Sequence, residues 1–262
     1  MRAVLLLSLL GACGRFGFDD TSRDAGVGGP GDISPTSYPA RVLADQPRAY
    51  YRLDEQNETV AVDATGNGND SGYYGGAAQF RWGVPGALRG DLDTAVQFDG
   101  VGNTGPVTEA SVSVPVGTTW GSDFSIELMI KPLSAAEPTV NNQLFTCEHY
   151  LVNGFRTGWR DDLNPILWTT EAGASSSITG SGPLALNTWS HVVFVMRGAT
   201  VEIWRDATLV ASETVDYIPA DSSAECGFGS FHGMPTHGVF DEVALYEYAL
   251  SAAQIGAHFA AR

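Results

Sequence analysis

The chain of 262 residues contains few basic side chains. Lysine occurs once, as Lys131, and Asp and Glu outnumber Lys and Arg by 30 to 14, which gives a formal net charge of −16. Binding to nucleic acid requires clustered Lys and Arg, and an anionic membrane surface attracts the same groups. The composition therefore argues against nucleic acid and anionic lipid as partners. It favours solubility, or the binding of a cation by some of the carboxylates.

Long apolar runs are missing as well, except at the start of the chain. Ala3 to Leu10 is apolar, follows the basic Arg2, and is too short to span a bilayer permanently. It leads into Leu10-Gly11-Ala12-Cys13, a pattern typical of bacterial lipoprotein cleavage sites. We predict a signal peptide over residues 1–12 and a lipidated Cys13, with a buried N-terminal strand as the alternative. No later stretch is apolar enough for a transmembrane helix.

Residues 13–38 contain few large apolar side chains and many Gly, Asp, Ser and Pro residues. Such a stretch cannot bury enough surface to offset the entropy lost on ordering. We predict a flexible tether between the lipid and a domain over residues 39–262. Gly14 replaces the Asp that retains many Gram-negative lipoproteins in the inner membrane. The resemblance to lipoproteins thus implies a lipid-anchored outer-membrane location, facing the periplasm or the cell surface.

Helical periodicity is scarce in residues 39–262, and short strand patterns separated by Gly-rich breaks predominate. In the run from Phe124 to Lys131, alternate residues are apolar and define a core face. The run from Val192 to Met196 is apolar on both faces, which is typical of a central strand. We predict an all-β sandwich that ends in a short helix.

That helix is predicted after a closing strand, Val239 to Tyr246, with Ser251 as its N-cap. Asp241 interrupts the apolar residues of the closing strand. A carboxylate there is costly unless it meets a cation or strong hydrogen-bond donors. We therefore expect this strand to close the fold, and Asp241 is a candidate metal ligand.

The run Phe240-Asp241-Glu242-Val243-Ala244-Leu245-Tyr246, followed by Ala249-Leu250-Ser251, resembles the closing signature of laminin-G-like, concanavalin-A-like jelly-roll domains. Other pieces occur in the order of that family: Val62-Asp63-Ala64-Thr65-Gly66-Asn67-Gly68-Asn69-Asp70, Gly83-Val84-Pro85-Gly86-Ala87-Leu88, Ala95-Val96-Gln97-Phe98-Asp99-Gly100, Phe124 to Pro132, Trp189 to Val195, and Val201 to Asp206. The resemblance implies that the predicted sandwich is a jelly roll of two antiparallel sheets. One departure is Asp206-Ala207, where the family usually has Asp-Gly in a hairpin turn.

The resemblance implies a possible calcium site. Residues Asp63 to Asp70 form what we call the glycine-bent loop. In calcium-binding members, an Asp of this loop meets an Asp near the closing strand, and these two correspond here to Asp63 and Asp241. Asn67 and Asn69 would assist, since Ca²⁺ takes carboxylate, amide and carbonyl oxygens. The alternative is an Asx-turn, in which Asp63 and Asn67 bond only their own backbone.

Cysteine is also rare, with 3 residues in the chain. If Cys13 carries lipid, Cys147 and Cys226 remain in an exported domain, where disulfides persist. We predict that these two form a disulfide. Two separate buried thiols are the alternative.

Catalytic motifs are missing too. The glucanases of this fold have a strand resembling Glu-x-Asp-x-x-Glu, which does not occur here, and neither Gly-x-Ser-x-Gly nor His-Glu-x-x-His is present. On the faces opposite the core, Glu127 and Lys131 on one strand, and Glu202 and Trp204 on another, suit a carbohydrate or a protein surface. Burial of Trp204 is the alternative. We predict a non-catalytic binding module of the cell envelope for carbohydrate or a surface protein, with a glucanase-type hydrolase as the alternative.

Overall fold

The computed structural model describes residues 36–56, 59–99, 110–115, 120–136, 142–149, 152–217, 225–229 and 236–262. They all belong to one compact unit, Ile33–Arg262. The predicted signal peptide, Cys13 and all but the last residues of the predicted tether lie outside the described residues. Neither α-helix of the described chain has the length and hydrophobicity that crossing a bilayer requires.

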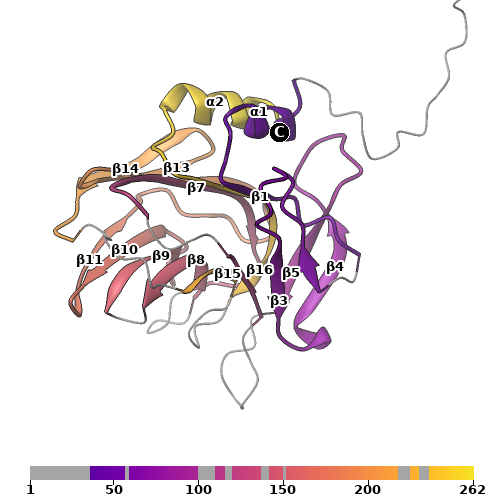
Figure 1. Cartoon of the computed structure of the whole chain (residues 1–262), viewed down its shortest axis with the longest axis horizontal. Coiled ribbons are helices and arrows are strands. Elements are labelled where there is room, and N and C mark those ends of the chain that lie inside the picture. The colour runs from indigo at the N-terminus through magenta and orange to yellow at the C-terminus, as the bar shows by residue number, and fades with distance from the viewer. Residues whose placement is uncertain are drawn as a thin grey trace, which may run out of the picture. The chain divides into compact units, whose positions relative to one another are not determined.

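Two antiparallel sheets are stacked face to face (Figure 1), which confirms the predicted jelly-roll sandwich. The first sheet has the order β14 (Thr208–Thr214), β13 (Thr200–Arg205), β12 (Ser190–Arg197), β7 (Asp123–Pro132), β16 (His237–Tyr246), β5 (Thr94–Asp99), β4 (Phe80–Pro85), and β1 (Ala49–Tyr51) also pairs with β16. The second has the order β11 (Ala174–Thr179), β10 (Pro165–Glu171), β9 (Asn153–Trp159), β8 (Asn142–His149), β15 (Glu225–Gly229), β6 (Ser111–Ser113), β3 (Ser71–Tyr74), β2 (Val60–Ala61). A short 3₁₀-helix, η1 (Ala77–Gln79), precedes β4.

The main core lies between the two sheets. The alternate apolar residues of β7, from Phe124 to Ile130, point into this core as the strand period predicts. β12 lies between β7 and β13, so it is the central strand that its apolar run indicates. Full burial of each large apolar side chain contributes roughly 1.5–3 kcal/mol, so this core is the main source of stability.

Two helices cover the outer face of the first sheet, where α1 (Tyr38–Ala44) and α2 (Ala252–Ala260) pack together (Figure 1). The predicted N-cap of α2 is confirmed, because the Ser251 hydroxyl accepts from the Gln254 N–H. Sequence analysis missed α1, although Ser37 caps it and a proline occupies its first turn. Tyr38, predicted at the end of the tether, is the first residue of α1, and its side chain is buried.

The hairpin between β13 and β14 turns at Asp206 and Ala207, whose φ angles are 50° and 58°. Two successive positive φ angles define the type I′ turn that the Asp-Gly sequence of the family favours. This chain therefore makes the same turn with a residue that carries a Cβ. For an L-residue the left-handed conformation costs roughly 1–2 kcal/mol, a cost that glycine avoids.

We predict that Ala207→Gly raises the free energy of unfolding by about 1 kcal/mol, since it removes the strain at a position with positive φ. Denaturant unfolding of the purified domain measures this change. Ala211→Gly is the matched control: it lies in β14 at an ordinary φ, so the same change should lower the stability there. Equal signs for the two variants would contradict the turn assignment.

Candidate functional site

The outer face of β7, where sequence analysis placed part of a ligand surface, is not open. Glu127 is 0% exposed. It lies among a second apolar cluster that α1 and α2 complete, with the members Tyr38, Val42, Tyr50, Leu88, Met129, Val193, Val195, Ala244, Tyr246, Leu250 and Ile255. The prediction that Glu127 faces a ligand is therefore wrong. Strand period separates the two faces of a sheet, but it does not show that the second face is covered.

The other three residues of the predicted ligand surface stay partly exposed. The ammonium of Lys131 lies 4.9 Å from the centroid of the Trp189 ring. On β13, the indole N–H of Trp204 donates to Glu202 over 3.0 Å, and Trp204 packs against the second cluster. Both strands, β7 and β13, pair with β12, which lies between them. Ligand binding by these three stays a prediction.

The carboxylate of Glu127 is surrounded by four side chains that satisfy it. The hydroxyls of Tyr38 and Tyr246 donate to it at 3.0 and 2.9 Å. His191 contacts it through Nε2 at 2.6 Å, and His258 contacts both oxygens through Nδ1 at 3.0 Å. We call these five residues the Glu127 network. Its members come from α1, β7, β12, β16 and α2, so one buried charge links both helices to three strands.

The contacts within the Glu127 network determine whether Glu127 and His258 are charged. Burial alone would raise the pKa of Glu127, but the hydrogen bonds and charges of His191 and His258 outweigh burial and hold that pKa well below its usual range. Burial acts to lower the pKa of His258, and the bonds to Glu127 and Asp45 more than reverse it, so that this pKa is raised. Its Nε2 lies 3.0 Å from Asp45 Oδ2, at the end of α1. The network therefore favours a charged carboxylate beside a charged imidazole.

In the glycine-bent loop after β2, the Asp63 carboxylate accepts hydrogen bonds from neighbouring residues. Asp63 accepts from the backbone N–H groups of Tyr50, Thr65 and Asn69, and from the side chains of Thr65 and Asn69. The side-chain amides of Asn67 and Asn69 donate to the Arg48 carbonyl at 3.0 and 2.9 Å. The bond from the Thr65 N–H to Asp63 is the Asx-turn that sequence analysis kept as the alternative, whereas Asn67 bonds the segment before β1 and not its own backbone.

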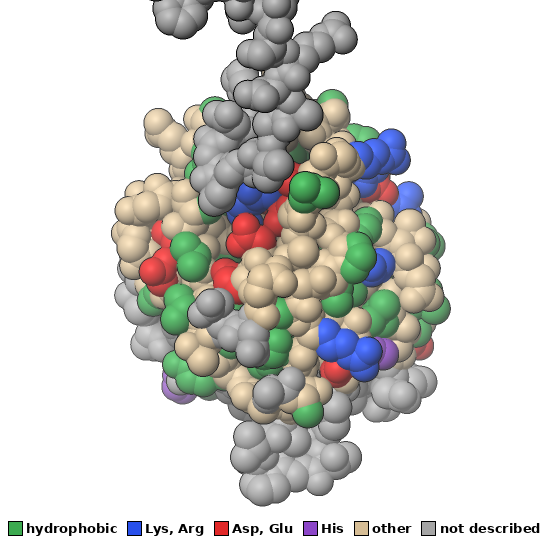
Figure 2. Space-filling model, turned by 90° about the vertical axis from the view of Figure 1, so that its right-hand side faces the viewer, with side chains coloured by type: hydrophobic (Ala, Val, Ile, Leu, Met, Phe, Trp, Pro, Cys, Tyr) green, Lys and Arg blue, Asp and Glu red, His purple; other side chains and the backbone are tan. Residues whose placement is uncertain are grey.

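The carboxylate of Asp241 lies close to those of Asp93 and Glu242. One carboxylate oxygen each of Asp93, Asp241 and Glu242 lies within 4.8 Å of the other two, and in the described chain Asp63 is not part of this group. Calcium binding by Asp63, Asn67, Asn69 and Asp241 stays a prediction, and the described chain adds a group of acids around Asp241. Burial raises the pKa of Asp93 to about 6, against the opposing effect of Arg52, and burial also raises the pKa values of Asp241 and Glu242. On the β4 and β5 side of the molecule, acidic side chains gather beside basic ones (Figure 2).

A pocket of about 710 Å³ opens beside the glycine-bent loop. Its wall comes from the end of α1, the segment before β1, the glycine-bent loop and the residues after β16, with the members Leu43, Gln46, Pro47, Arg48, Thr65, Asn67, Asn69, Glu247 and Tyr248. Arg48 and Glu247 form an ion pair at its rim. The structure thus places Asn67 and Asn69, predicted as metal ligands, in a pocket wall. Sequence analysis missed Arg48, Glu247 and Tyr248, because their segments meet only in the fold.

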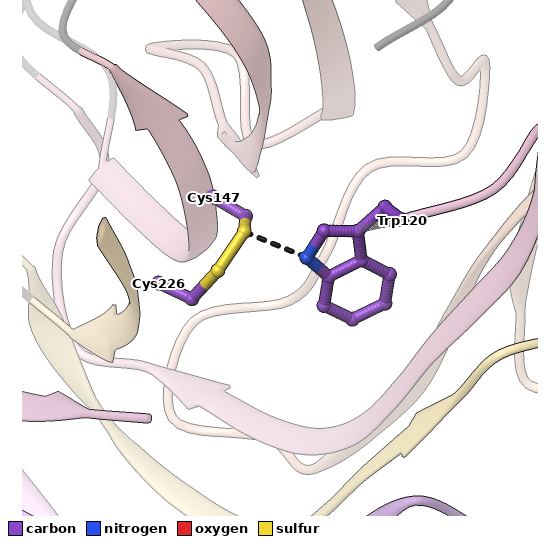
Figure 3. Close-up of a disulfide and its surroundings, with 3 residues drawn as sticks. All are labelled: Trp120, Cys147 and Cys226. Atoms are coloured by element: carbon purple, nitrogen blue, oxygen red, sulfur yellow. Dashed lines mark hydrogen bonds between the residues drawn. A yellow bond between two sulfur atoms is a disulfide. The ribbon is translucent and has the colours of Figure 1, made fainter. Parts of the chain in front are cut away.

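Cys147 and Cys226 form a disulfide, as predicted (Figure 3). They stand directly opposite each other on β8 and β15, which pair in the second sheet. The indole N–H of Trp120 points at the bond and contacts Cys147 Sγ at 2.7 Å. The disulfide links residues 79 apart in sequence and lies in the core, away from the sheet face that α1 and α2 cover.

Comparison with known proteins agrees with this architecture. Residues 103–256 match the Laminin_G_3 family, described as the concanavalin A-like lectin/glucanases superfamily. The match covers more than half of the chain, and the chain belongs to this family. No match was found among curated protein sequences.

Several solved structures share the fold at low sequence identity. Domain 4 of the arabinanase AbnA from Geobacillus stearothermophilus, solved with arabinotriose, has a TM-score of 0.59 and 19% identity over 81% of this chain and 97% of its own. The binding domain of Paraclostridial Mosquitocidal Protein 1 has a TM-score of 0.63 and 14% identity over 83% of this chain, which spans 52% of that one. The Trypanosoma rangeli sialidase has a TM-score of 0.57 and 14% identity over 80% of this chain, which spans 32% of the sialidase. At these identities the likeness concerns the fold.

The Glu127 network predicts a stability that declines in alkaline solution. Because folding raises the pKa of His258, its stabilising effect is complete below the unfolded pKa of about 6.5 and is lost as pH rises through the folded pKa. We expect His258→Gln to lower the free energy of unfolding by roughly 1.5–3 kcal/mol at pH 6, and by less at pH 9.

Urea unfolding at a series of pH values checks this expectation. His149→Gln is the matched control, because His149 is exposed at the end of β8 and lies outside the Glu127 network. A deficit of His258→Gln that does not change between pH 6 and pH 9 would contradict the assigned role.

Proposed function

We propose that this protein is a non-catalytic carbohydrate-binding module of the cell envelope, held at the outer membrane by lipid on Cys13. The observation that carries the proposal is the pocket of about 710 Å³ beside the glycine-bent loop. Small-molecule pockets commonly enclose roughly 300–1,000 Å³, so it has the size for a short oligosaccharide. It replaces the outer face of β7 as the binding surface.

The chemistry of the pocket wall suits sugar hydroxyls. Arg48 offers donors, and Glu247 offers acceptors. The amide nitrogens of Asn67 and Asn69 are engaged with backbone carbonyls, which fixes both side chains and leaves their amide oxygens as oriented acceptors. Tyr248 contributes ring surface, and its hydroxyl is held by the Asp45 carbonyl. Preformed polar groups beside aromatic area are what a carbohydrate site needs.

Binding without hydrolysis is favoured by the carboxyl groups available. A glycosidase needs two carboxyls that flank the bond, roughly 5–9.5 Å apart. Among the described residues that line the pocket, Glu247 is the one carboxylate. Asp93, Asp241 and Glu242 do lie together, but the last two are 0% exposed, so no polysaccharide reaches them.

The structural comparisons agree with this proposal without deciding it. One structure with this fold, domain 4 of AbnA, contains arabinotriose, and the described part of the present chain shares its fold over nearly the full length of that domain. The sialidase likeness keeps catalysis as the alternative, and a surface protein remains the other class of partner. Arabinotriose is therefore a sensible first probe within a wider panel.

We predict that a glycan array identifies an oligosaccharide ligand, and that Arg48→Ala weakens its binding by about tenfold or more, since it removes a charged hydrogen-bond donor. Titration calorimetry with the array hit and with arabinotriose measures the loss. Arg81→Ala is the matched control, because Arg81 is an exposed arginine in an ion pair with Asp99, away from the pocket wall. If Arg48→Ala and Arg81→Ala bind the ligand with equal affinity, the pocket is not the binding site. Polysaccharide hydrolysis by the wild type would favour the enzyme alternative.

The lipid anchor is a separate part of the proposal and has its own test. Cys13→Ala should move the protein from the membrane fraction to the soluble fraction, because it removes the residue that carries the lipid. Gly14→Ser is the matched control and should stay with the outer membrane, whereas Gly14→Asp should shift the protein to the inner membrane. Unchanged fractionation of Cys13→Ala would rule out the anchor.

A further inference from the structure

The carboxylates of Asp93, Asp241 and Glu242, which we call the acidic triad, are brought together by an irregularity in the closing strand. Between Asp241 and Ala244, β16 advances three residues while its partner β7 advances two, from Met129 to Glu127. The extra residue is a β-bulge, and Glu242 occupies it with a φ of 53°. In a regular strand, neighbouring side chains point to opposite faces. The bulge breaks that alternation, so both carboxylates reach Asp93.

Each of the two buried acids uses one oxygen and leaves the other without a partner. Asp241 Oδ2 accepts from the Ala87 N–H at 2.7 Å, and Glu242 Oε1 lies 3.4 Å from Arg52 Nε. Asp241 Oδ1 and Glu242 Oε2 are buried and have no hydrogen-bond partner among the described residues. Both side chains are 0% exposed. A buried carboxylate oxygen without a donor is costly, so this pair calls for a positively charged group.

Among the described residues, Arg52 is the one basic side chain in an ion pair with the acidic triad. Arg52 contacts Asp93 at 2.5 Å, Glu242 at 3.4 Å and also Asp91 at 3.4 Å. One guanidinium thus contacts two carboxylates of the acidic triad and a third, that of Asp91, outside it. If Asp241 and these three acids are all ionised, the excess is three negative charges, or two for the triad alone. The Glu127 network is the opposite case, because four donor side chains satisfy its single carboxylate.

The backbone next to the acidic triad is shaped around it. A Cβ at Gly86 would lie 2.8 Å from the Asp93 carbonyl oxygen and 3.1 Å from Asp241 Oδ2, so only glycine lets this segment approach so closely. That approach brings the Ala87 N–H onto one oxygen of Asp241 and leaves Oδ1 for another ligand. The three carboxylate oxygens lie within 4.8 Å of one another, and two oxygens that ligate one calcium ion are at most about 5 Å apart.

We propose that Asp93, Asp241 and Glu242 form a binding site for a hard divalent cation of the calcium class. The carboxylates supply three oxygen ligands, and the unpartnered Asp241 Oδ1 and Glu242 Oε2 are the atoms that a cation satisfies. Hard cations of this kind take carboxylate and carbonyl oxygens, and every ligand here is a carboxylate. The bound cation joins the segment before β5 to the bulge of β16. This site shares Asp241 with the family-based expectation but uses neither Asp63 nor the glycine-bent loop.

Calorimetric titration of calcium chloride into the EDTA-treated protein tests the proposal, together with thermal melts in EDTA and in calcium. We expect saturable binding of one ion and a higher Tm with calcium, since a ligand that binds only the folded state stabilises it. Glu242→Gln keeps the shape of the side chain but should weaken binding by about tenfold or more. Asp91→Asn, which also touches Arg52 but is not in the acidic triad, should bind calcium like the wild type.

The remaining outcomes are equally decisive. Identical wild-type melts in EDTA and in millimolar calcium, with no heat of binding, would overturn the proposal. Calcium binding that survives Glu242→Gln but is lost in Asp63→Asn would place the ion in the glycine-bent loop instead and would also overturn it. If Glu242→Gln does not fold, Asp93→Asn, at the edge of the buried pair, carries the same expectation. Because the pocket variants leave the acidic triad unchanged, failure of carbohydrate binding does not affect this test.

Discussion

The burial of Glu127 is the constraint on which the outer half of the molecule depends. A charged carboxylate in an apolar layer is stable only if donors surround it, and the sheet alone provides His191 and Tyr246. Tyr38 and His258 complete the set, and they come from the two helices. The helices therefore do more than cover apolar surface, because their position is fixed by a directional network around one charge. This also explains why the face of β7 that looks polar in the sequence is closed to ligands.

The first sheet contains a second group of buried acids, and two of their oxygens have no partner among the described residues. Around Glu127 the donors outnumber the charge, and both carboxylate oxygens have partners within the network. At the bulge of β16, the acidic triad exceeds the single guanidinium of Arg52. The bulge carries a non-glycine residue at positive φ, a strained conformation that persists only where its surroundings enforce it. The two groups lie on strands that pair with each other, so a change at the bulge also alters the support beneath Glu127.

Much of the fold was predictable because strand period and turn chemistry are local properties. The core face of β7, the central position of β12 and the cap of α2 all follow from residues that are close in sequence. The disulfide followed from the export prediction and the cysteine count. The binding site was harder to predict from the sequence, because it is formed by segments that are distant in the chain and meet only in the fold. Glu127 appeared exposed since no local pattern indicates a covering helix, and α1 was missed because its seven residues are too few for a periodic signal. The cost of burying the Asp241 carboxylate was recognised. Its closeness to Asp93 and Glu242 was not, because it depends on a bulge that no local sequence pattern indicates.

The Glu127 network has a consequence for how the chain can be rearranged. Tyr38 and His258, near the two ends of the compact unit, both bond the same carboxylate, so those ends are held within a few residues of one point. Nearby ends are the condition under which a chain tolerates circular permutation and insertion into a host protein. A short linker from residue 262 to residue 36 would therefore let new termini open at a hairpin of the second sheet. The pocket and the helix pair would keep their geometry, since neither depends on where the chain is cut.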